Sequence, residues 1–127
     1  MHVTIEDLKY FTDGRGSVVE PLEPERIVLQ RNVHVVLTEP GCVRGNHYHE
    51  RGVETLVVYG PALVRTRETP GEALETQVPG GAVFRFHIPP GVSHAVMNTG
   101  TGANLLLAFN TVPHDPAAPD TFMDVLF

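Results

Sequence analysis

The sequence predicts an all-β domain, either a small barrel or a sandwich of two sheets. Short apolar segments rich in β-branched residues recur at spacings of roughly ten residues, with turn residues between them. The 12 glycines and 11 prolines are spread along the chain, which favours short elements over long helices. No segment shows the apolar period of an amphipathic helix. Since 127 residues suit one domain with one core, we expect residues 1–127 to fold as a unit.

Residues 1–40 are expected to supply the N-terminal strands. Weak apolar alternation runs to residue 12, and a short strand at residues 17–20 is stopped by two prolines. Residues 27–38 are rich in valine, isoleucine and leucine, and they predict a longer strand. His34 lies within that strand, and we expect its ring to face solvent or a carbonyl group.

The centre of the chain predicts a series of strands joined by tight turns. We expect these strands at residues 47–49, 53–59, 62–67, 74–78, 83–88, 94–98 and 104–109. The tail, residues 113–127, is rich in proline and aspartate and then becomes apolar. We expect this tail to dock on its own barrel or on a partner subunit.

Charge and cysteine content exclude several classes of protein. The formal net charge is −6, whereas general nucleic-acid-binding domains carry a basic stripe. Cys42 has no partner for an internal disulfide, and we expect a small buried side chain there, with a reactive thiol or soft metal ligand as the alternative. The sequence has neither a secretory hydrophobic segment nor an apolar span long enough to cross a membrane. These features favour a cytoplasmic protein that binds neither membrane nor nucleic acid.

Residues 41–60 hold the pattern from which function is inferred. His47 and His49 are separated by one residue, so both side chains point to the same face of an extended strand. A hairpin can return Glu54 to that face. Two imidazoles and a carboxylate that converge form a metal site, and we expect His94, much later in the chain, to complete it.

The same residues resemble the two sequence motifs of the cupin superfamily. The first motif matches residues 41–60 through its glycines, both histidines and the glutamate. The second matches residues 79–98 through Pro89, Gly91, His94 and Asn98. The resemblance implies a double-stranded β-helix, or jelly-roll, barrel that holds a divalent metal ion. Its metal ligands would be His47, His49, His94 and a carboxylate, which is Glu54 or, as the alternative, Glu50.

A finer resemblance covers most of the chain. Residues 44–49, Arg-Gly-Asn-His-Tyr-His, and the tail at residues 115–122 are similar to the cupin domain that ends bifunctional capsular-polysaccharide enzymes. That domain binds zinc and epimerises a nucleotide-linked keto-sugar. Residues 13–16 and Glu20 resemble a segment shared by dTDP-4-dehydrorhamnose 3,5-epimerases and sugar ketoisomerases. Those relatives often work without metal and use the position matched by His47 as a base, whereas this sequence keeps both motif histidines.

Taken alone, the predicted ligands suit a metal with an open coordination position. Three imidazoles and one carboxylate accept zinc, iron, manganese, nickel or copper, and the resemblance favours zinc. A ligand-accepting metal polarises a substrate carbonyl and stabilises the enolate that forms when the neighbouring C–H proton leaves. Proton transfer needs an acid–base group, for which His47, another metal-free histidine and Tyr59 are candidates. Tyr48 points away from the two motif histidines and is expected in the core.

Arg44 is the predicted substrate-binding residue, because a guanidinium binds a diphosphate or carboxylate through two hydrogen bonds. The other arginines that alternate with apolar residues are expected to be solvated or ion-paired: Arg65, Arg67 and Arg85. Among the remaining histidines, we expect a structural role for His87. Surface positions are expected for His2 and His114.

Three functions remain open from the sequence. The first is epimerisation or isomerisation of a nucleotide-linked keto-sugar in polysaccharide or deoxysugar biosynthesis. The second is a metal-dependent oxygenase or another small-molecule enzyme, because the same ligands with iron or copper support oxygen chemistry. The third is a non-catalytic module that binds a sugar or effector. From the resemblance we also expect a homodimer.

Overall fold

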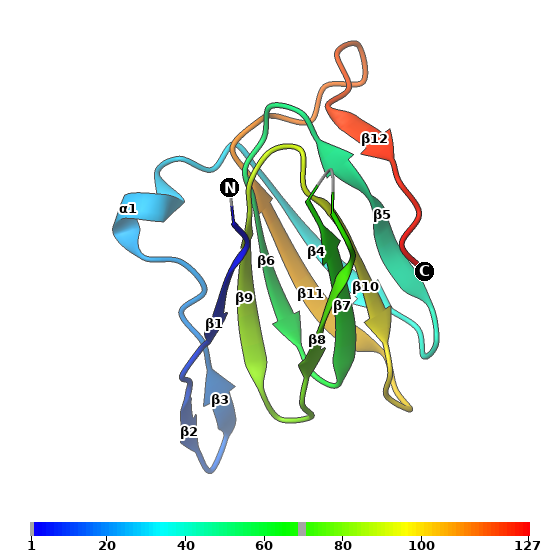
Figure 1. Cartoon of the computed structure of the whole chain (residues 1–127). Helices are drawn as coiled ribbons and strands as arrows, with labels where there is room; N and C mark the ends of the chain where they lie inside the picture. The colour runs from blue at the N-terminus through cyan, green and yellow to red at the C-terminus, as the bar shows by residue number, and fades with distance from the viewer. Residues whose placement is uncertain (1, 69–70) are drawn as a thin grey trace.

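A computed structural model describes residues 2–68 and 71–127, and Figure 1 shows them as two sheets packed face to face. The elements in chain order are β1 Thr4–Asp7, β2 Phe11–Asp13, β3 Gly16–Val18, α1 Pro24–Ile27, β4 Asn32–Thr38, β5 Val43–His49, β6 Glu54–Tyr59, β7 Ala62–Arg67, β8 Leu74–Val78, β9 Val83–Ile88, β10 Ser93–Asn98, β11 Asn104–Asn110 and β12 Thr121–Met123. Within the described residues, no helix is long and apolar enough to span a membrane.

The strands form two five-stranded antiparallel sheets. One has the order β1-β9-β6-β11-β4 and the other β12-β5-β10-β7-β8, while β2 and β3 form a separate hairpin. From β4 to β7, and again from β8 to β12, each strand lies in the opposite sheet from the one before it. This alternation is the jelly-roll arrangement, so the predicted all-β cupin barrel is confirmed.

The apolar core lies between the two sheets. It consists of the buried apolar side chains Leu56, Val58, Ala62, Val64, Val78, Phe86, Ile88, Val92, Val96 and Leu106. These side chains alternate along their strands with residues that face outward, as the period of two requires. Full burial of such a side chain contributes about 1.5–3 kcal/mol. Polar residues gather beside this core where β5 ends and β6 begins, and the core residue Ile88 pairs with Glu54 there.

The prediction of a strand from residue 27 is wrong in its first part. Residues 24–27 form α1, which begins with Pro24 at its first turn, and the strand starts only at Asn32. Proline suits this position because its fixed φ and missing N–H match the start of a helix. The segment before α1 is tied to the first sheet by Arg85, whose guanidinium donates hydrogen bonds to Glu6 and Glu23.

The C-terminal tail lies against the second sheet of its own barrel. β12 pairs with the end of β5, and the Phe122 ring stacks on Tyr48 at a centroid distance of 5.5 Å. Beyond β12, the Asp124 carboxylate accepts hydrogen bonds from Arg67 and Ser93. Tyr48 is therefore half-buried beneath the tail on the outer face, and it is not part of the core.

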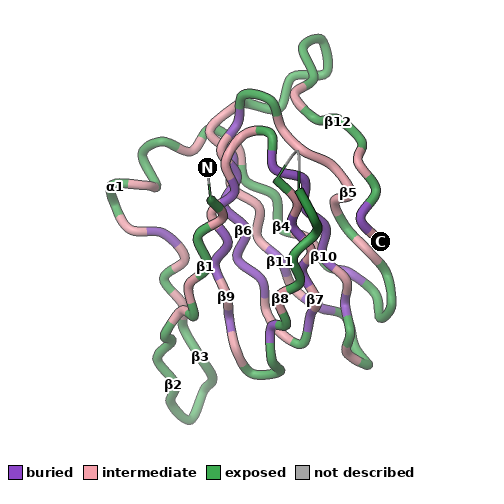
Figure 2. The backbone as a smooth tube through the Cα atoms, viewed as in Figure 1, coloured by how far each residue is buried: buried purple, intermediate pink, exposed green. Residues whose placement is uncertain are grey.

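Cys42 is exposed, so the expectation of a buried side chain there is wrong. It lies in the turn between β4 and β5, where its N–H donates to the Glu39 carbonyl. Figure 2 shows the turn between β4 and β5 as exposed, and turns of this kind run over the surface, away from the core. The arginine expectations are confirmed, because Arg65, Arg67 and Arg85 all form ion pairs.

Candidate metal centre

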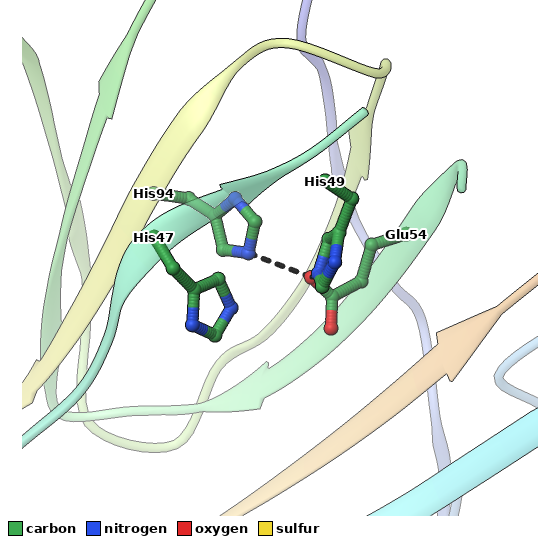
Figure 3. Close-up of side chains that lie close together, drawn as sticks. All are labelled: His47, His49, Glu54 and His94. Carbon is green, nitrogen blue, oxygen red and sulfur yellow. Dashed lines mark hydrogen bonds and ion pairs between the residues drawn. The ribbon is translucent and has the colours of Figure 1, made fainter. Parts of the chain in front are cut away.

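Four side chains converge at the polar end of the barrel (Figure 3). His47 and His49 end β5, Glu54 begins β6, and His94 is the second residue of β10. One nitrogen or oxygen atom from each side chain lies within 4.8 Å of all the others. These are the four residues that the sequence predicts as metal ligands, and the structure brings all of them together. The alternative carboxylate, Glu50, is exposed and lies outside this cluster.

Glu54 is the centre of the cluster. Its Oε2 lies 2.7 Å from Nε2 of His49 and 2.6 Å from Nε2 of His94. The His47 ring lies beside both other rings, with centroid distances of 5.0 Å to His49 and 4.9 Å to His94. Glu54 and His94 are buried, while His47 and His49 are half-buried at the side facing the cavity.

Backbone carbonyls fix the tautomers of two rings. Nδ1 of His49 lies 3.2 Å from the Asp120 carbonyl oxygen, and Nδ1 of His94 lies 3.1 Å from that of Val92. A carbonyl oxygen only accepts, so each Nδ1 carries the proton and donates it. In a neutral ring, Nε2 then presents a lone pair to the Glu54 carboxylate, which also bears only lone pairs. In the ion-free protein, a second proton on the ring resolves this conflict by letting Nε2 donate to Glu54; a metal ion between these atoms resolves it by taking the lone pairs as ligands, so the donor set fits a bound metal ion.

The charges within the cluster shift three pKa values. Burial, with the neighbouring His94, lowers the pKa of His47 to about 4, which leaves this ring neutral and able to act as a ligand or base. Burial opposes ionisation of Glu54, but hydrogen bonds from His49 and His94 outweigh it and hold the pKa of Glu54 well below its usual range. Burial also opposes a charged His49, yet the Glu54 carboxylate outweighs it and raises the pKa of His49.

A β-bulge at Asn46 aligns the strand that carries the two motif histidines. His47 pairs with His94, but the next pair along β10 is Ala95 with Gly45, so Asn46 is an extra residue. Because a bulge inverts the alternation, Arg44 faces the same side as His47, although simple alternation would place them on opposite faces. Arg44 accordingly lines the cavity beside the cluster, with hydrogen bonds to the Leu37 carbonyl and Thr38.

The backbone conformation of the bulge explains why glycine and asparagine follow Arg44. Gly45 has a φ of 94°, and a Cβ there would lie 2.6 Å from the His94 carbonyl oxygen, so this position requires glycine. Asn46 has a φ of 57°, in the left-handed region that asparagine tolerates. Its Oδ1 accepts hydrogen bonds from the N–H groups of Leu126 and Phe127, so the bulge also anchors the tail.

Asp120 connects the tail to the turn between β5 and β6. Its carboxylate accepts hydrogen bonds from the N–H groups of Arg51 and Gly52, and its carbonyl oxygen accepts the Nδ1–H of His49. Burial opposes its ionisation, but the Gly52 and Arg51 N–H groups outweigh it and lower the pKa of Asp120. The sequence analysis missed this residue, because only the fold brings residue 120 to residue 49.

The cluster opens into a cavity with two compartments. The outer compartment has a volume of about 290 Å³, and the segment between β11 and β12 forms one of its walls. The inner compartment has a volume of about 200 Å³, with Arg44 on its rim. Its apolar walls are Val36, Leu56, Val96, Leu106 and Ala108. His47 and Glu54 line both compartments, so a ligand in either one contacts the cluster.

The expectation that Tyr59 carries a proton needs correction. Tyr59 ends β6, whereas Glu54 begins it, and Tyr59 lines a different cavity together with Tyr10 and Gly81. The two residues also have opposite parity on the strand, so Tyr59 is not placed to exchange a proton at the cluster. His34 is exposed, as expected, and it also lines both compartments of the site.

Comparison with known proteins gives the family. The sequence profile of the polysaccharide biosynthesis C-terminal domain matches residues 11–122. The chain belongs to this family. Over 118 residues it is 28% identical to a UDP-2-acetamido-2,6-beta-L-arabino-hexul-4-ose reductase of Pseudomonas aeruginosa strain PA103. The aligned region makes up 91% of this chain and 31% of the reductase.

Solved structures agree with this assignment. The capsular polysaccharide assembling protein CapF of Staphylococcus aureus superposes with a TM-score of 0.70 at 27% identity, over 94% of this chain and 34% of CapF. A dTDP-4-dehydrorhamnose 3,5-epimerase from Sulfolobus tokodaii has the same fold, with a TM-score of 0.76 at 19% identity, over 95% of this chain and 76% of the epimerase. The chain thus spans about a third of the length of the Pseudomonas reductase and of CapF.

Proposed function

We propose that this member of the polysaccharide biosynthesis C-terminal domain family binds a divalent metal ion and epimerises or isomerises a nucleotide-linked keto-sugar. The observation that carries the proposal is the convergence of three imidazoles and one carboxylate, with lone pairs facing one another, at a cavity. The names of its relatives support the substrate class, since they include a reductase of a UDP-linked hexulose and a dTDP-sugar epimerase.

The residues around the cluster would divide the work as follows. His47, His49, Glu54 and His94 would hold the ion. When bound, a divalent cation polarises a ketone and balances the negative charge of its enolate. Arg44 would bind the diphosphate of the nucleotide, because two hydrogen bonds to Thr38 and Leu37 leave further N–H groups of its guanidinium free to donate.

The first test is the metal content of purified wild type and of His47→Ala and His94→Ala, measured by mass spectrometry. We expect about one equivalent in the wild type, since the cluster offers one set of ligands, and a loss of metal in both variants. His2→Ala is the control: it changes an exposed histidine that is distant in sequence from the cluster, and it should keep the metal.

The identity of the metal discriminates the functions. Zinc, with incorporation of solvent deuterium into a UDP-linked 4-keto-sugar, supports the epimerase or isomerase. Iron or copper with oxygen uptake would instead assign the chain to the oxygenases. A carefully prepared wild type without any metal would refute metal binding, and His47 would then stand as a metal-free base, as in the ketoisomerases that the sequence resembles.

A further inference from the structure

His34 is the histidine of the cavity that the ligand cluster does not use. It lies on β4 and pairs with Ala108 of β11, which pairs in turn with Leu56 of β6. Leu56 is two residues from Glu54, so their side chains share the inner face of the sheet, and paired residues in a sheet point the same way. The His34 ring is therefore directed into the space between the two sheets, although β4 is an edge strand.

The position of His34 suits a group that faces a bound sugar. Two strand spacings separate β4 from β6, which is about 10 Å between their axes. His34 is not among the described residues whose ligand atoms lie within 4.8 Å of one another, so its ring stays free to face a sugar in the cavity. Four residues line both compartments of the cavity: His34, His47, Glu54 and Ala108.

Other candidates for proton transfer are engaged elsewhere. Once an ion is bound, the free ring nitrogens of His47, His49 and His94 and one oxygen of Glu54 would be its ligands. The Asp120 carboxylate accepts hydrogen bonds from Arg51 and Gly52, and Asp115, which lines the outer compartment alone, accepts the Ala117 N–H. Arg44 carries a guanidinium, which donates hydrogen bonds and has no acceptor, so it does not serve as a base. Among the described residues that line the cavity, His34 and His114 remain, and His114 lines the outer compartment alone.

We propose that His34 is the proton carrier of the reaction, an inference that rests on the proposed function. The imidazole takes the proton from the carbon next to the ketone. The C–H electron pair becomes the C=C bond of an enolate, and the carbonyl π pair moves to the oxygen. In an isomerisation, the enolate oxygen takes the proton of the hydroxyl on the neighbouring carbon, the oxygen that lost this proton forms the new carbonyl, and the C=C pair takes the imidazolium proton at the former ketone carbon. In an epimerisation, solvent protonates the first carbon on the opposite face and the imidazolium releases its proton to solvent. Neither route oxidises or reduces the sugar.

His114 is the matched control in the same wall. Its ring lies 6.2 Å from that of His34, edge to face, in the segment that follows β11. His114→Gln changes the same residue type at the same cavity, but at a position that does not reach the inner compartment. Both positions are exposed, so neither substitution opens a hole in the core.

The experiment compares zinc-loaded wild type, His34→Gln and His114→Gln. Zinc content is measured first, followed by calorimetric binding of tropolone, a planar hydroxy-ketone that resembles an enolised substrate. Deuterium incorporation is then followed by NMR at the carbon next to the ketone of a UDP-linked 4-keto-6-deoxyhexose.

We expect His34→Gln to keep its zinc and tropolone binding but to lose deuterium incorporation by about 10²–10⁴-fold, the usual contribution of a general acid–base group. His114→Gln should keep its zinc and lose far less incorporation than His34→Gln does, because a group in the outer wall alone affects how the sugar binds but does not carry the proton.

The outcomes separate the two proposals. Wild-type incorporation in zinc-loaded His34→Gln would overturn the role of His34 and leave the proposed function intact. If His114→Gln lost deuterium incorporation and His34→Gln did not, the role of His34 would also be overturned, because the carrier would then be His114. A wild type that holds zinc and binds tropolone but incorporates no deuterium would refute the proposed function, and the role of His34 with it.

Discussion

Among single residues, Glu54 shows most clearly how burial and charge are balanced at the site. A buried carboxylate is costly unless it is paired, and here it is paired twice, with His49 and His94 on the same oxygen. His47 has no such partner and is held neutral by its surroundings, with a pKa of about 4. The same cluster therefore contains one ring that resists protonation and one, His49, that favours it.

This difference predicts a pH dependence of stability in the metal-free protein. His47 has a folded pKa of about 4 against an ordinary value of 6.5, so the unfolded chain binds its proton first. The contribution of a neutral His47 is therefore complete above pH 6.5 and declines as the pH falls towards 4. We expect the Tm of apo wild type to fall more between pH 7 and pH 5 than that of apo His47→Gln. Parallel Tm profiles for the two proteins would contradict the shift.

Among the elements, β5 and the tail around β12 are joined by two sets of hydrogen bonds, one before and one after β12. The bulge at Asn46 sets the direction of Arg44 and His47 and also binds the end of the tail. Asp120, just before β12, orients His49 and the turn that leads to Glu54. Groups that orient metal ligands in this way contribute strongly to metal affinity, although they do not touch the ion.

Asp120→Ala should therefore weaken metal binding. Loss of the carboxylate frees the Arg51 and Gly52 N–H groups, and the carbonyl that fixes the His49 tautomer loses its anchor. We expect a 10- to 100-fold lower zinc affinity in competition with a chromogenic chelator. Asp115→Ala, in the same segment but bonded only within its own turn, should bind zinc as the wild type does. Equal affinities in all three proteins would show that the tail does not orient the ligands.

The sequence predicts the strands of the barrel closely because each carries alternating apolar residues between turn signals. It also predicts the four clustered side chains, since strand alternation and motif spacing are local properties. It misses α1, where valine and isoleucine suggest a strand but Pro24 starts a helical turn. Asp120 and His34 are missed for a different reason, because their roles arise from pairings between distant strands. The bulge that turns Arg44 towards the cavity is likewise a property of the pairing with β10.

On the scale of the whole molecule, the two faces of the first sheet differ. The inner face carries the core and the site. On the outer face, the segment around α1 is tied to Arg85, while the opposite edge carries a row of exposed apolar side chains on β4: Val33, Val35 and Leu37, with exposures of 53%, 68% and 63%. An uncovered apolar row on an edge strand is a surface on which chains associate.

We expect the homodimer to form through this row, because a second copy would cover it with an identical apolar surface. Val35→Lys should then shift the protein to a monomer, measured by light scattering coupled to size-exclusion chromatography. Leu74→Lys is the control, since Leu74 is equally exposed at 69% but lies on β8, at the edge of the other sheet. A monomeric wild type, or a Val35→Lys dimer, would exclude this interface.

The outer wall of the cavity has a further consequence. The ligands come from strands of both sheets, whereas one continuous segment between β11 and β12 supplies Val112, Pro113, His114, Asp115, Pro116 and Pro119 to the wall. Only its last residues, from Asp120 onward, support the ligands. A large part of the outer wall is therefore encoded apart from the four clustered side chains. Under the proposed function, variants confined to residues 112–119 would change which sugars the cavity accepts and would leave the cluster itself unaltered.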